Sequence, residues 1–157
     1  MPPNFPGSPR FMMQCFMDSM TIVRSRTRPT FFVTFTANPK WAEIVRELGS
    51  CETAFDRPDL VTRVFHLKLI ALLRDLTELH YFGRCNGYVW TIEYQKRGLP
   101  HAHILLFLVD EDRRLYYDAA AIDRVIYAEL PGVNLDPTGR LRSVVARQML
   151  HGPYGGR

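Results

Sequence analysis

The feature that most constrains the fold is an apolar run that begins directly after two histidines. Residues 104–109 are six consecutive bulky apolar residues, and a run of this length predicts a buried core strand. His101 and His103 precede it with one residue between them. Alternate side chains of a strand point to the same face, so we expect the two imidazoles to lie side by side where the strand starts. Burial would deny them water, and a divalent metal is one partner that two neutral imidazoles can share.

The segment before the histidines supplies oxygen-bearing side chains. Residues 88–95 alternate as a strand does, with Glu93 and Gln95 on one face. The link of residues 96–100 suits an antiparallel hairpin, which would let one of these two side chains face the histidines. Two imidazoles and one oxygen ligand suit Mg²⁺ or Mn²⁺ acting as a Lewis acid on a phosphate. Lys96 and Arg97 would then hold neighbouring phosphates.

Each of these residues also has a simpler interpretation. The histidines can satisfy each other and the backbone, and Lys96 and Arg97 can belong to a solvated turn. A further hypothesis is a metal-free acid/base pair in a phosphodiesterase. We rank it last, because the other histidines of the chain do not repeat the motif on strands.

The remaining segments show either the two-residue repeat of a strand or the 3.6-residue repeat of a helix. Strand alternation is present in residues 31–36, with Phe32, Thr34 and Thr36 on one face. Helices are expected over residues 9–23, 41–48, 58–79, 118–130 and 141–150. The methionines of the first helix and Trp90 are expected to pack in the core. The element order predicts an α+β fold, in which helices flank a mostly antiparallel sheet that carries the histidine strand.

Composition excludes several classes of protein. The 157 residues suffice for one domain, and the net charge of +4 is compatible with phosphate-bearing partners. Three cysteines without a CxxC pair argue against a disulfide framework or a cysteine zinc site. No apolar run reaches about 18 residues, and the N-terminus lacks the pattern of a secretory signal. We therefore expect a soluble protein.

Several motifs in order resemble one known family. Residues 95–103, read as QKRGLPHAH, closely resemble the HUH motif (His-hydrophobic-His) of Helitron rolling-circle transposases. Residues 34–41 are similar to that family's "TFTxNPxW" stretch, and residues 57–69 resemble its long helix. Residues 7–10, 128–131 and 149–153 are similar to its entry segment and its downstream landmarks. The chain thus resembles the Helitron helicase-like N-terminal domain, a Rep-type endonuclease.

The resemblance implies a function in the nucleus on single-stranded DNA. In that family the HUH histidines hold a divalent metal, and a tyrosine attacks DNA to leave a 5′-phosphotyrosine link and a free 3′-OH. His101 and His103 carry over as metal ligands, with Glu93 or Gln95 as the third. Full-length relatives carry a helicase domain in the same chain, but no Walker A sequence is present here, so no nucleotide site is expected.

The catalytic nucleophile is the part that the sequence does not supply. Tyrosine is a suitable nucleophile for DNA strand transfer, and the candidates are Tyr116, Tyr117, Tyr127 and Tyr154. The family's catalytic tyrosines lie beyond a landmark at which this chain stops, so none of the four is assigned. We therefore expect residues 1–157 to be a single, incomplete domain. The alternative is an inactive DNA-binding module or a degenerate transposon relic.

Overall fold

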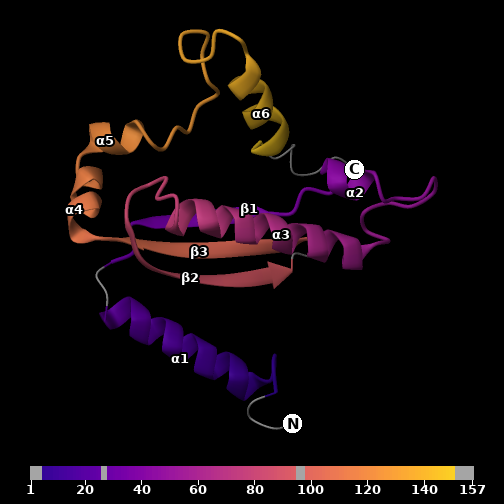
Figure 1. The fold of residues 1–157 in the computed structure, drawn as a ribbon, viewed down its shortest axis with the longest axis horizontal. Helices are drawn as coiled ribbons and strands as arrows, with labels where there is room; N and C mark the ends of the chain where they lie inside the picture. Colours follow the sequence, from indigo (N-terminus) through magenta and orange to yellow (C-terminus); the bar gives the residue numbers. More distant parts are fainter. Residues whose placement is uncertain (1–4, 26–27, 95–97, 151–157) are drawn as a thin grey trace, which may run out of the picture. The chain divides into compact units, whose positions relative to one another are not determined.

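The computed structural model describes residues 5–25, 28–94 and 98–150 and contains helices and one sheet (Figure 1). The elements are α1 (Pro9–Ser25), β1 (Phe31–Thr36), α2 (Ala42–Val45), α3 (Pro58–Thr77), β2 (Cys85–Tyr94), β3 (Pro100–Leu108), α4 (Asp110–Arg113), the 3-10 helix η1 (Arg114–Tyr116), α5 (Ala119–Asp123) and α6 (Arg140–Gln148). The chain divides into two compact units, Met1–Leu115 and Tyr116–Arg157. The first unit holds the whole sheet, so the fold is α+β with an antiparallel sheet, as predicted.

The sheet has three strands in the order β1-β3-β2, and both neighbours of β3 run antiparallel to it. The predicted hairpin is therefore confirmed: Glu93 of β2 lies opposite His101 of β3. On the other side of β3, Thr36 of β1 lies opposite the same histidine. Since β3 is the central strand, side chains from both edge strands flank its two histidines.

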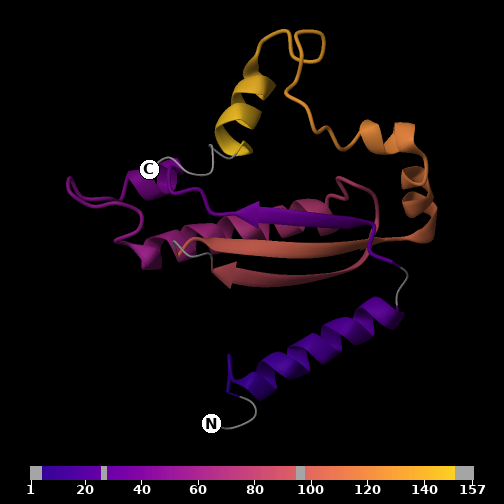
Figure 2. The ribbon, with the colours of Figure 1, turned by 180° about the vertical axis from the view of Figure 1, so that it is seen from behind.

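One face of the sheet packs against α3. The side chains of β3 that point to this face are fully or almost fully buried; they are Ala102, Ile104, Leu106 and Leu108. Phe35 of β1 stacks on Phe65 of α3, with 5.3 Å between ring centroids. In Figure 1 α3 lies in front of the sheet, and in Figure 2 it lies behind it. The histidines have the opposite parity and therefore project from the other face, which we call the open face.

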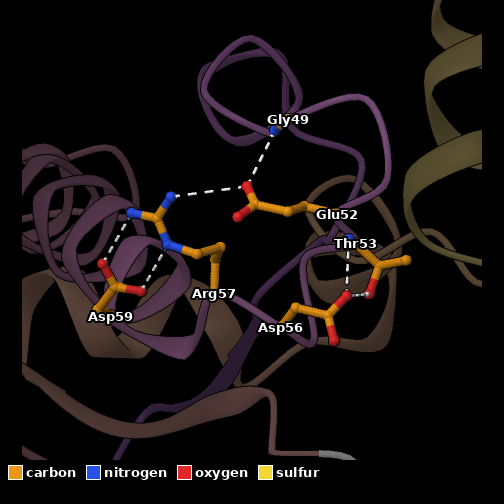
Figure 3. Close-up of polar contacts among 6 residues, drawn as sticks. All are labelled: Gly49, Glu52, Thr53, Asp56, Arg57 and Asp59. Carbon is orange, nitrogen blue, oxygen red and sulfur yellow. Dashed lines mark hydrogen bonds and ion pairs between the residues drawn. The ribbon is translucent and has the colours of Figure 1, made fainter.

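Local polar contacts hold the loop that leads into α3 (Figure 3). Pro58 begins the helix, where its missing N–H costs nothing. Arg57 donates two hydrogen bonds of 3.0 Å to the Asp59 carboxylate. These contacts lower the pKa of Asp59 to about 2. Earlier in the loop, the Gly49 N–H donates to Glu52, and Thr53 donates twice to Asp56.

Three expectations about packing and extent are wrong. No residue of α1 is buried, and Met12 and Phe16 are more than half exposed, so its methionines do not fill a core. Helical periodicity specifies which side of a helix can pack, but not the surface on which it packs. Trp90 is 37% exposed, because it lies on the edge strand β2. The helix expected over residues 118–130 is shorter, since α5 ends at Asp123. No residue of α5 is buried, and a short helix depends on the burial of an apolar side for its stability.

The other elements lie where they were expected, with small changes at their ends. The short helix α2 has only four residues instead of the expected eight.

In the second unit, Asp136 accepts a 2.7 Å hydrogen bond from the Arg142 N–H in the first turn of α6. Within the part of the chain that the structure describes, no helix combines the length and the apolar character that crossing a bilayer requires.

Candidate metal centre on the open face of the sheet

The two histidines lie next to each other on β3. Their ring centroids are 4.5 Å apart, and the ring planes meet at 66°. Ala102 between them is fully buried on the opposite face, whereas both histidines are only half-buried. The two imidazoles therefore lie side by side on one face of the strand, as expected from strand alternation. Both remain within reach of solvent.

Glu93 of β2 contacts the histidine diagonal to it. One carboxylate oxygen, Oε2, lies 3.3 Å from Nε2 of His103. An ionised carboxylate can only accept, so His103 Nε2 carries the hydrogen in this contact. The Glu93 side chain is 68% exposed, so it can turn without disturbing the core. Of the two oxygen-bearing side chains predicted for this face, Glu93 reaches the histidines, whereas Gln95 lies outside the described residues.

Thr36 of β1 contacts His101 from the other side. Its hydroxyl oxygen hydrogen-bonds to Nδ1 of the His101 ring. If Nδ1 donates this bond, Nε2 of the same ring carries no hydrogen, which is the protonation state that a metal ligand needs. Sequence reasoning missed Thr36, although its parity already placed it on one face with Phe32 and Thr34. The missing information was the pairing of β1 with β3.

Phe32, also on β1, stacks on the second histidine. Its ring is parallel to that of His103, with an interplanar angle of 2° and 5.5 Å between centroids. Within the described residues, Nδ1 of His103 is buried and has no hydrogen-bond partner. Phe32 therefore fixes the plane of the imidazole, while the hydrogen-bonding capacity of the ring is only partly used.

The donor atoms of this cluster suit a divalent cation, but they do not surround one point. Two ligands at right angles around an ion, each at about 2.1 Å, are about 3.0 Å apart, close to the 3.3 Å between His103 Nε2 and Glu93 Oε2. Imidazole nitrogen and carboxylate oxygen are both ligands of Mn²⁺ and related ions. However, no three His, Cys, Asp or Glu side chains in residues 5–25, 28–94 and 98–150 are arranged to hold a metal. Side-chain rotation at Glu93 and a further ligand are therefore required.

The remaining candidate residues fall into two groups. Lys96, Arg97 and Tyr154 lie outside the described residues. Tyr116 ends η1, and Tyr117 and Tyr127 are 69% and 54% exposed. All three belong to the second compact unit, and none of them is assigned as the nucleophile.

Comparison with known proteins identifies the family of the chain. A family model described as "Helitron helicase-like domain at N-terminus" matches residues 1–106. The match begins before α1 and extends through the histidine pair to Leu106 of β3. No curated protein matches the chain.

Proposed function

The chain belongs to the Helitron helicase-like N-terminal family, and from this premise we propose that it is the metal-binding part of a single-stranded DNA nicking and strand-transfer endonuclease. The observation that carries the proposal is that His103 contacts both His101 and Glu93 on the open face of the sheet. Their imidazole nitrogens and carboxylate oxygens are ligands that divalent metal ions bind. We give the chain no nucleophile, and the complete reaction requires one.

In this proposal His101 and His103 hold the ion through ring nitrogens, and Glu93 supplies an oxygen. A bound Mg²⁺ or Mn²⁺ would polarise a DNA phosphate and neutralise charge that develops during displacement. Thr36 would hold the His101 ring in the orientation and tautomer that binding needs. Glu93 would exchange its hydrogen bond with His103 for the ion, and His103 would bind through Nε2 as the neutral tautomer that carries its hydrogen on Nδ1.

Lys96 and Arg97 extend the proposal to the DNA backbone. Both follow Gln95 in the link between β2 and the histidine strand. Their positive charges would bind phosphates beside the one at the ion. The net charge of +4 favours the same partner.

Calorimetry with Mn²⁺ tests the metal site directly. We expect the wild-type chain to bind one ion, the His101→Ala variant to lose the binding, and the His66→Ala variant to retain it. His66 is a matched control because it is an exposed histidine on α3. Equal isotherms for the wild-type chain and His101→Ala would refute the metal site.

The second candidate is a module that binds single-stranded DNA without catalysis. It is favoured by the exposed aromatic ring of Phe32 on the open face. This candidate predicts a salt-sensitive DNA affinity that survives replacement of both histidines. An affinity that collapses when a chelator is added would count against it.

A further inference from the structure

The open face carries an exposed aromatic ring that supplies no ligand to the metal site. Phe32 is 63% exposed although it lies in a strand of the sheet. Single exposed apolar residues are common on protein surfaces, so exposure alone carries no inference. The orientation of the ring is more specific, because it lies parallel to the imidazole of His103.

The position of β1 leaves one side of this ring open. His103 occupies the side of Phe32 that faces the central strand β3. β1 is an edge strand of the sheet, and no further strand pairs with its outer side in the described part of the chain. A flat group could therefore stack on the outer face of the ring and extend the row formed by His103 and Phe32.

A nucleobase is the flat group that suits this place. Phe32 has no hydrogen-bonding group, so it can bind any base through its π-face without reading the base edge. A base in a duplex is already stacked on both sides, so only an unpaired strand can offer one. A strand whose phosphate lies at the histidines would carry an adjacent base past the edge of β1.

We propose that the outer face of the Phe32 ring is a stacking platform for a nucleobase of single-stranded DNA next to the phosphate held at His101 and His103. This inference rests on the proposed function and adds a base-binding subsite to it. The other exposed aromatic residues of the sheet are unsuited to the role. Tyr88, Trp90 and Tyr94 pair with Leu106, Ile104 and Pro100 and share their face, which is the one that α3 packs against and not the face of the histidines.

The experiment uses an oligonucleotide of about 12 nucleotides that carries one 2-aminopurine, in a buffer with Mg²⁺. Stacking on an aromatic ring quenches the fluorescence of this base. We expect the wild-type chain to quench it and the Phe32→Ala variant to lose the quenching, with affinity lowered about 5- to 150-fold. Phe32→Tyr should restore both, since the ring is kept. Phe55→Ala is the matched control, because Phe55 is 52% exposed and lies outside the sheet.

The outcomes separate this inference from the proposed function. Equal quenching and affinity for Phe32→Ala and Phe55→Ala overturn the platform, as does the absence of quenching by the wild-type chain. The Mn²⁺ isotherms of the wild-type chain and of His101→Ala, measured without DNA, judge the metal site independently of the Phe32 variants. A change in oligomeric state of Phe32→Ala, with quenching intact, would assign the ring to contact with a second copy and overturn the platform.

Discussion

The contact between Thr36 and His101 makes the metal site sensitive to one hydroxyl group. Replacing Thr36 by Val removes the hydroxyl that hydrogen-bonds to Nδ1 of His101 and keeps the size and branching of the side chain. Valine is favoured in strands, so β1 should be retained. The His101 ring then loses the partner that orients it and selects its tautomer. We expect weaker binding of Mn²⁺ without loss of the fold.

The expected loss of Mn²⁺ affinity is moderate, because Thr36 contacts a metal ligand but is not itself one. Replacing a residue that orients a metal-bound histidine typically weakens metal affinity about 10- to 100-fold, which corresponds to about 1.4–2.7 kcal/mol. Only one of the two histidines is affected, because His103 contacts Glu93 and Phe32 instead. Binding should therefore weaken rather than disappear, unlike the expectation for His101→Ala.

Calorimetry with Mn²⁺, at one fixed pH for all variants, measures this difference. Thr34→Val is the matched control, since Thr34 lies two residues earlier on the same face and pairs with His103. Its Mn²⁺ affinity should equal that of the wild-type chain. The reasoning fails if Thr36→Val binds Mn²⁺ as tightly as wild type, or if both threonine variants weaken binding equally.

Three further predictions concern the framework around the site. Ile104→Ala should lower the free energy of unfolding by about 2–5 kcal/mol, because Ile104 is fully buried in the central strand; a loss below about 1 kcal/mol in urea denaturation would contradict this assignment. Gly83→Ala should destabilise the protein by more than about 1 kcal/mol, since Gly83 has φ +119° and an added Cβ would lie 3.1 Å from Asp112; an unchanged melting temperature would show that the backbone relaxes there. Arg57→Gln should raise the pKa of Asp59 from about 2 towards the ordinary value of about 3.9, as followed by NMR of the carboxyl carbon. Because the folded-state pKa is depressed, the stabilisation from this pair is present above about pH 4 and is lost as the pH falls towards 2; an unshifted Asp59 pKa in the variant would exclude Arg57 as the cause.

The part of the site that could be read from the sequence is the part set by local periodicity. His101 and His103 share a face because a strand alternates, whatever the rest of the chain does. Glu93 could be placed near them because a short link joins its strand to theirs. The strand limits 31–36 and the long helix after Pro58 were likewise predictable from alternation, turn residues and helix-start signals.

The packing of distant segments was not predictable in this way. Sequence patterns predicted a core-packing α1 and a helix over residues 118–130, but the first has no buried residue and the second is much shorter. A helical pattern states that a segment can bury one side. Whether it does so depends on another surface, which a local pattern does not contain.

The sequence by itself determined that two imidazoles project from the same side of one core strand, because that relation needs only the two-residue repeat of a strand. Only the tertiary structure decided what surrounds them. Thr36 and Phe32 reach the histidines through the antiparallel register of β1 with β3, across more than sixty residues of chain. That register depends on which buried faces pack together against α3, and such a choice is made by the whole core rather than by any one segment.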